Sequence, residues 1–206
     1  MLRTPFARDF ILVRAFESAC HLHSPTPESK HMKSKLLGFV LVALGIWVTP
    51  SQPVVAETKE NAAFEKIRGL AGHWEGTFSW SGGRNASGKI GAQYYTTGNG
   101  SAVIENLVQD GIPSMTSVYH LDNADLRLTH YCAARNQPRL KATSVDQDLG
   151  RITFSFVDIT NLSSPHAGHV NGLEIRFLAP DHITLLFRFT GDGKESDELI
   201  DLKRKT

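Results

Sequence analysis

The chain has 206 residues, with 22 Lys and Arg against 21 Asp and Glu, two cysteines and 41% hydrophobic residues. A formal net charge of +1 without a long basic run leaves no electrostatic footprint for nucleic acid, so no nucleic-acid partner is predicted. A charged fraction of 21% with 9% aromatic residues argues against a chain that is disordered throughout.

Residues 1–31 precede any recognisable element. They are either an over-extended gene start, with Met32 as the true initiator, or a long leading region, and we expect them to be disordered and outside the fold. Cys20 lies in this leader, which leaves Cys132 as the cysteine of the folded part. An internal disulfide is therefore not predicted.

Residues 32–56 have the three-part layout of a secretory signal peptide. Two lysines precede the apolar run 36–48, and the small residues Val54 and Ala56 suit cleavage after Ala56. The run has 13 residues, whereas a membrane-spanning helix needs about 20, so no stable membrane anchor is predicted. The sequence thus predicts a secreted or periplasmic protein whose mature part is a single domain over residues 57–206.

The spacing of apolar residues predicts one short helix followed by strands. Phe64, Ile67 and Leu70 recur at helical spacing within residues 61–70, and after Gly72 the apolar residues alternate with polar ones, as in strands with one buried face. Turn signals such as Asn-Gly and Asp-Gly separate about ten such runs. The predicted strands are 73–80, 88–97, 101–109, 115–122, 125–132, 139–146, 150–158, 169–178, 181–190 and 195–203.

Connections this short can only join neighbouring antiparallel strands, so the strands are expected to form a meander. A long meander avoids exposed edges by closing on itself. The predicted fold is therefore all-β: a ten-stranded antiparallel up-and-down barrel with a short N-terminal helix. A barrel of eight or more strands can leave interior room for one small ligand.

Several motifs resemble a known superfamily. Gly72-His73-Trp74 after a short helix resembles the G-x-W opening of the calycins, which include lipocalins and fatty-acid-binding proteins. Other segments resemble bacterial lipocalin-like proteins of unknown function: 118–122 (VYHLD), 128–134 (LTHYCAA), 136–138 (NQP), 156–158 (FVD) and 160–162 (TNL). The resemblance implies a lipocalin-like barrel in which Trp74 plugs the closed end. It also implies that Arg188 or Arg204 stacks on the indole as a cation over a π system.

Strand 125–132 carries the most unusual inward face. Leu126, Leu128, His130 and Cys132 share that face by the period of two, so an imidazole and a thiol are expected to point into the barrel. Both groups are competent ligands for a soft metal or haem iron. The alternative is a hydrogen-bonded buried histidine with a small apolar cysteine. A nucleophilic Cys–His pair is disfavoured because side chains at i and i+2 on a strand are parallel.

Two tyrosines are the other candidate ligand-binding residues. On strand 115–122 either Tyr119 or His120 faces inward, and the more apolar set favours Tyr119. Its hydroxyl and that of Tyr94 could orient a ligand, or both could cap the layers of the barrel interior. Glu105, between Val103 and Leu107, is either an outward charge or an inward carboxylate.

The sequence therefore predicts an exported barrel that binds a small hydrophobic molecule through Tyr94, Tyr119, His130 and Cys132. One alternative is haem binding, as in the nitrobindin-like relatives of this architecture, which use a histidine close to the C-terminus. No histidine follows His182, so haem would require His130, His169 or His182. The other alternative is a packed envelope interaction module with no ligand. No cofactor, metal site or catalytic residue is otherwise predicted, and enzymatic activity is left open.

Overall fold

The computed structural model describes residues 58–206; the predicted leader and signal peptide lie outside the described residues. The helix α1 (Lys59–Arg68) begins after Thr58, whose side-chain oxygen accepts a hydrogen bond of 3.1 Å from the backbone N–H of Asn61. The helix ends at Gly69 and is followed directly by the first strand. Within the described region, no helix has the length and apolar character needed to cross a membrane.

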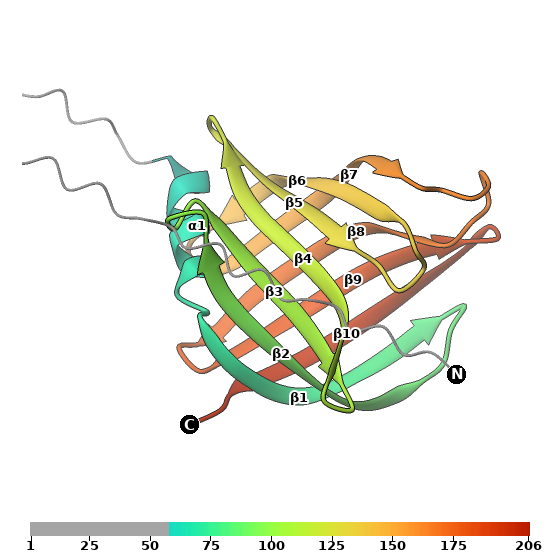
Figure 1. Ribbon diagram of the computed structural model, residues 1–206, viewed down its shortest axis with the longest axis horizontal. Coiled ribbons are helices and arrows are strands. Elements are labelled where there is room, and N and C mark those ends of the chain that lie inside the picture. Colours follow the sequence, from blue (N-terminus) through green and yellow to red (C-terminus); the bar gives the residue numbers. More distant parts are fainter. Residues whose placement is uncertain (1–57) are drawn as a thin grey trace, which may run out of the picture. The chain divides into compact units, whose positions relative to one another are not determined.

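Ten antiparallel strands close into a barrel in the order β1-β10-β9-β8-β7-β6-β5-β4-β3-β2, so the predicted fold is confirmed. Every strand pairs with its sequence neighbour, and β1 closes the barrel on β10 (Figure 1). The strands are β1 (Gly72–Gly82), β2 (Ser87–Thr97), β3 (Ala102–Gln109), β4 (Ile112–Asp122), β5 (Asp125–Tyr131), β6 (Gln137–Asp146), β7 (Arg151–Thr160), β8 (His169–Ala179), β9 (His182–Gly191) and β10 (Lys194–Arg204).

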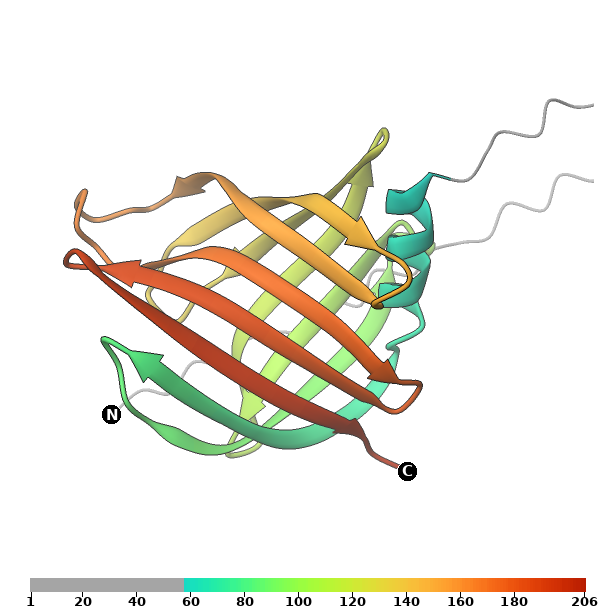
Figure 2. The same ribbon diagram turned by 180° about the vertical axis from the view of Figure 1, so that it is seen from behind.

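The helix α1 lies at one end of the barrel, which we call the closed end, and both views show it there (Figures 1 and 2). Its residues Ala63, Phe64 and Ile67 are buried. Along the strands, buried residues alternate with partly or fully exposed ones, which is the pattern of side chains that point alternately into and out of the barrel. The other end, which we call the open end, is bordered by the last residues of β1 and β5 and the first residues of β10.

The closed end is held by the G-x-W motif. Trp74 is 3% exposed, and its indole N–H donates a 2.8 Å hydrogen bond to the carbonyl oxygen of Leu70. The guanidinium of Arg204 lies 4.4 Å from the centre of the Trp74 ring and donates to the carbonyls of Ala71 (2.7 Å) and Gly69 (2.8 Å). The two residues are direct cross-strand partners on β1 and β10.

The glycine of the motif is required by the backbone. Gly72 has a φ of 130°, a conformation that residues with a side chain rarely adopt. A Cβ at this position would also lie only 3.1 Å from Nη1 of Arg204. Of the two arginines that the resemblance offered as partners of Trp74, Arg204 occupies the position, whereas Arg188 is exposed on β9.

The wall of the barrel separates near the open end. β5 pairs with β6 only through Arg127, Leu128 and Thr129, and β7 pairs with β8 only through residues 151–155. The β6–β7 ribbon therefore diverges from both neighbours beyond these pairs. Asn136 spans part of the gap, because its side-chain amide donates a 2.8 Å hydrogen bond to the carbonyl oxygen of Gly168.

Arg204 is expected to stabilise the closed end more than an exposed arginine stabilises a strand. Arg204→Ala removes a cation–π contact and two hydrogen bonds to backbone carbonyls, so we expect the free energy of unfolding in urea to fall by about 1–3 kcal/mol. Arg188→Ala, the matched control, should change it by less than about 0.5 kcal/mol. Equal losses in the two variants would contradict the assignment of Arg204 to the closed end.

Candidate functional site

A row of polar side chains crosses the inside of the barrel. Tyr94 on β2 pairs directly with Glu105 on β3, Glu105 pairs with Ser117 on β4, and Ser117 pairs with His130 on β5. All four side chains are at most 1% exposed. We call these four residues the polar row; the strand register alone brings them together, because directly opposite residues point to the same face of a sheet.

Hydrogen bonds connect the polar row from end to end. The Tyr94 hydroxyl donates to Oε1 of Glu105 at 3.1 Å, and the Tyr119 hydroxyl donates to Oε2 at 2.5 Å. The hydroxyl of Ser117 also bonds to Glu105 and lies 3.0 Å from Nδ1 of His130. Glu105 is therefore joined to His130 through one serine hydroxyl.

The protonation of this cluster follows from its burial. Burial raises the pKa of Glu105, while the hydrogen bonds from Tyr119, Tyr94 and Ser117 act in the opposite direction. Burial, and then the nearby charge of Glu105, hold the pKa of Tyr94 and of Tyr119 well above the usual value for tyrosine. Both phenols therefore stay protonated, and each donates a hydrogen bond to the carboxyl group of Glu105.

His130 is neutral near pH 7 and has one free nitrogen. Burial lowers the pKa of its imidazole to about 4. Nδ1 is taken by Ser117, whereas Nε2 is buried and has no hydrogen-bond partner among the described residues. A buried polar atom without a partner costs about 1–3 kcal/mol, so an unpaired imidazole nitrogen indicates a position where a ligand atom can bind.

His130 also belongs to the wall of an interior cavity of about 400 Å³ at the open end, although its Nε2 is covered by neighbouring side chains. Its wall is mainly apolar and aromatic, with polar atoms from His130, Cys132, Glu198, Arg84 and Gln109. The remaining residues of the wall are Phe78, Trp80, Met115, Ala133, Ala134, Val170, Phe187 and Phe189. A cavity of this size and lining is typical of sites for small organic molecules.

A carboxyl group lies on the wall formed by β10. Glu198 is 5% exposed, and burial raises its pKa to about 7, against the opposing effects of a hydrogen bond from Trp80 and the charge of Arg84. The guanidinium of Arg84 lies 3.8 Å from the ring centre of Phe189 and 4.8 Å from that of Trp80. Glu198 and His130 are thus the two titratable groups buried in the cavity wall beside the thiol of Cys132.

The structure places the four predicted ligand-binding residues in two groups. His130 and Cys132 line the cavity, as inward positions of β5 and its extension. Tyr94 and Tyr119 also point inward, but their hydroxyls are engaged by Glu105 and neither residue lines the cavity. Burial raises the pKa of the Cys132 thiol, which makes it a weak nucleophile.

The other histidines considered as haem ligands lie elsewhere. Nδ1 of His169 lies 3.0 Å from the carbonyl oxygen of Ala167, and Nε2 of His182 lies 2.9 Å from Asp201. Neither residue lines the cavity, so His130 is the histidine there. Residues 58–206 contain no group of three or more His, Cys, Asp or Glu side chains arranged to hold a metal ion.

Three residues of the site were not predicted from the sequence. Ser117 was not singled out, the side to which Glu105 points was left open, and Glu198 was not considered. For the two glutamates, the alternation of apolar residues along the strand could have indicated an inward side chain. Glu105 lies between Val103 and Leu107, and Glu198 precedes Ile200 and Leu202 at the same spacing of two, and all of these residues are buried.

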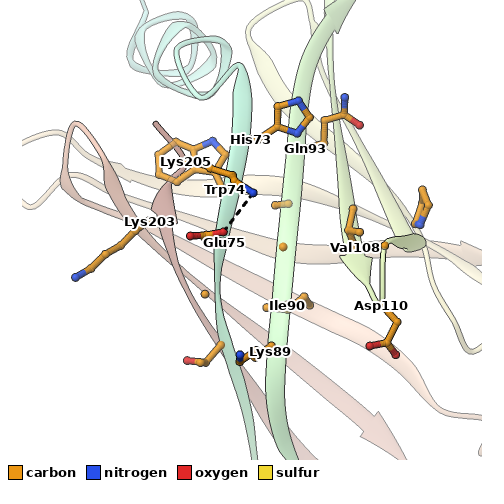
Figure 3. Close-up of a pocket in the computed structure, with 16 residues that line it drawn as sticks. His73, Trp74, Glu75, Lys89, Ile90, Gln93, Val108, Asp110, Lys203 and Lys205 are labelled. Carbon is orange, nitrogen blue, oxygen red and sulfur yellow. Dashed lines mark ion pairs between the residues drawn. The ribbon is translucent and has the colours of Figure 1, made fainter.

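A larger hollow of about 930 Å³ lies on the outer face of β1 and β2, and Figure 3 shows it. Exposed side chains border it, among them His73, Glu75 and Lys89. Lys205 and Glu75 form an ion pair there with an N–O distance of 3.7 Å. This hollow is open to solvent and contains no unpartnered buried group, so the interior cavity is the better candidate site.

No family model matches the sequence, and no curated protein is similar to it. Among solved structures, a protein of unknown function from the DUF3598 family of Nostoc punctiforme matches 68% of this chain with a TM-score of 0.47 and 13% identity. This chain covers 49% of the Nostoc protein, about half of its length. Rv2717c of M. tuberculosis matches 70% of this chain, over 98% of its own length, with a TM-score of 0.49 and 17% identity.

These similarities concern the fold alone. The described part of the chain is a closed ten-stranded antiparallel meander preceded by a short helix. Any function must be argued from the interior cavity and the residues that line it.

The neutral state of His130 predicts a specific dependence of stability on pH. The folded pKa of about 4 lies below the unfolded value of 6.5, so the unfolded chain binds more protons between these values and His130 loses its stabilising contribution as the pH falls from about 6.5 to 4. In His130→Gln this part of the pH dependence should disappear. The difference between wild type and variant should change by about 3 kcal/mol over this window.

Urea unfolding at a series of pH values measures this difference. His120→Gln, on the outer face of β4, is the matched control and should keep the pH dependence of the wild type. An identical pH dependence in wild type and His130→Gln would show that His130 is not held neutral by burial.

Proposed function

We propose that this protein binds a small, mainly apolar molecule in the interior cavity at the open end of the barrel. The observation that carries the proposal is the unpartnered Nε2 of His130, buried beside an aromatic cavity of about 400 Å³. Such cavities bind a ligand through apolar contacts, and a few polar groups fix its orientation. Here the polar groups are the imidazole of His130 and the carboxyl group of Glu198.

The division of the barrel interior supports a carrier over a packed module. Towards the closed end, large side chains such as Tyr94, Tyr119 and Phe154 are almost fully buried and fill the space between the strands. Towards the open end, the same interior contains the cavity. In a module without a ligand, Nε2 of His130 would stay without a protein partner, whereas a bound ligand can supply one.

Haem is the second candidate, and the free nitrogen of His130 favours it. A neutral imidazole whose other nitrogen is held by a hydrogen bond is the state in which histidine binds iron. His130 would hold the haem iron, and Cys132 lies in the same cavity. When bound, haem would supply redox or gas-binding chemistry that the side chains of this chain do not have.

Ligand binding is expected to depend on the volume of the cavity. The dye 8-anilinonaphthalene-1-sulfonate should bind the wild-type protein, and Val170→Phe should weaken binding at least about tenfold because the larger side chain occupies the cavity. Leu199→Phe, on the outer face of β10, should bind as the wild type does. Fluorescence titration of the three proteins measures the affinities.

The same preparations distinguish the candidate ligands. The protein is purified without added cofactor, and its absorption spectrum and native mass are recorded. A Soret band that is lost in His130→Ala would favour haem, and additional organic mass without a Soret band would favour an apolar carrier. A protein without additional mass that also fails to bind the dye would contradict both proposals and favour the packed module.

We also propose that the protein is exported. The proposal rests on the signal-like layout of residues 32–56. The intact mass of the protein purified from its native host should correspond to a chain that begins at Glu57. A mass that includes the apolar run 36–48 would contradict cleavage after Ala56.

A further inference from the structure

The link between Glu105 and His130 passes through a single proton. The hydroxyl of Ser117 can donate one hydrogen bond, and three neighbouring groups can accept it: the carboxyl group of Glu105, the phenol oxygen of Tyr119, and Nδ1 of His130, 3.0 Å away. When Ser117 donates to Glu105 or Tyr119, Nδ1 of His130 must donate to the serine oxygen or remain without that bond. The state of Glu105 therefore decides what His130 must do.

The ionised state of Glu105 gives one consistent arrangement of protons. An ionised carboxylate has only acceptors, and it receives hydrogen bonds from the hydroxyls of Tyr94, Tyr119 and Ser117. The oxygen of Ser117 must then accept from Nδ1–H of His130. A neutral imidazole has one proton, so Nε2, on the other side of a ring that belongs to the cavity wall, is left with its lone pair.

Protonation of Glu105 would reverse the direction of the hydrogen bond between Ser117 and His130. The carboxyl group would then contribute a donor of its own, and the proton of Ser117 could turn to Nδ1 of His130. Nε2 would in that case carry the imidazole proton and become a donor. The two states of the Glu105 carboxyl group thus correspond to opposite hydrogen-bonding characters at Nε2 of His130.

We propose that Glu105 is a positioning residue that fixes the tautomer of His130 through Ser117, so that the cavity presents an acceptor and selects ligands with an N–H or O–H donor. The selection of ligands with a donor rests on the proposed function and makes it more specific. The assignment of the His130 tautomer is independent of the proposed function. Glu198, on the opposite wall, adds a second acceptor when it is ionised. An apolar amine, indole or phenol fits this combination, and a molecule whose polar atoms only accept does not.

Few other polar groups face the two ends of this link. Glu105 is surrounded by Tyr94 from β2 and by Ser117 and Tyr119 from β4. On the other side, the ring of His130 packs on Phe187 of β9, with the ring centres 5.2 Å apart. Glu198 of β10, Cys132 and Arg84 also line the cavity.

The tautomer can be measured without any ligand. The chain has nine histidines, and the signals of His130 are assigned by their absence in His130→Gln. Long-range ¹H–¹⁵N spectra of the full chain with labelled histidine then show which ring nitrogen carries the proton. At pH 8 we expect the wild-type protein to have the proton of His130 on Nδ1.

Two variants test whether Glu105 and Ser117 control the tautomer. Glu105→Gln replaces the carboxylate by an amide that can donate to Ser117, and Ser117→Ala removes the link, so in both we expect the Nε2–H form of His130 to increase. Glu75→Gln, on the outer face of β1, is the control and should leave the spectrum of His130 unchanged. If Glu105→Gln does not fold, Ser117→Ala and the wild-type spectrum still decide the question. A wild-type protein with its proton on Nε2 would overturn the proposal.

Three bicyclic probes test the ligand class. Indole donates a hydrogen bond, isoquinoline accepts one, and naphthalene does neither. In the wild type at pH 8, where Glu198 is ionised and only accepts, indole should bind about fivefold tighter than naphthalene, as one net hydrogen bond implies, and isoquinoline should bind no tighter than naphthalene. In Glu105→Gln or Ser117→Ala the preference for indole should be lost.

The outcomes separate the two proposals. If no probe binds while His130 has its proton on Nδ1, the cavity does not bind such ligands: the proposed function and the ligand class both fail, and the role of Glu105 stands. If the probes bind without preference and His130 has its proton on Nε2, the further inference fails and the proposed function survives.

Discussion

The interior of this barrel is organised around one buried carboxyl group. Transfer of a carboxylate from water to a protein interior costs several kcal/mol unless hydrogen bonds compensate. Glu105 receives such bonds from Tyr94, Tyr119 and Ser117, which come from the two strands that flank β3. These bonds exist only in one register, because a shift of one residue would turn every side chain of a strand to the other face. The carboxyl group thus penalises alternative pairings of β2, β3 and β4.

The two ends of the barrel have different roles as a consequence. At the closed end, Trp74 and Arg204 donate hydrogen bonds to the backbone between α1 and β1, and the large side chains next to them are almost fully buried. At the open end, the wall separates beside β6 and β7, and the interior contains the cavity. The polar row lies between these regions. Its side chains are joined by hydrogen bonds, and the exception is Nε2 of His130, which is buried without a partner in a residue of the cavity wall.

Sequence analysis predicted the fold because the strands alternate cleanly and the connections are short. The same alternation placed His130 inward through Leu126 and Leu128, and it placed Tyr119 rather than His120 inside. The alternation could not decide whether Glu105 points into or out of the barrel. One charged residue in an apolar run is compatible with a bulge, with a side chain that points outward, or with a buried side chain whose charge is compensated by hydrogen bonds. The compensation comes from Tyr94 and Tyr119 on other strands, whose register a single sequence does not contain. For the same reason the sequence left both Arg188 and Arg204 as candidate partners of Trp74. Only the register of β1 and β10, which pairs Trp74 with Arg204, decides between them. Cavity volume depends on how many side chains fill a shared space, and no local pattern records that sum.

The electrostatics of the cavity follow from the opposite effects of burial on its acid and its base. Burial lowers the pKa of His130 to about 4 and raises that of Glu198 to about 7. Between these values both groups are neutral, so an apolar ligand that enters the cavity does not remove water from a charge on either of them. Above about pH 7, Glu198 ionises near Arg84, and the wall then presents a carboxylate opposite the imidazole. A ligand with a donor gains from this change, because the carboxylate is a stronger acceptor than the acid. The two groups that burial keeps neutral at moderate pH are therefore also the groups that can distinguish a donor from an acceptor at higher pH.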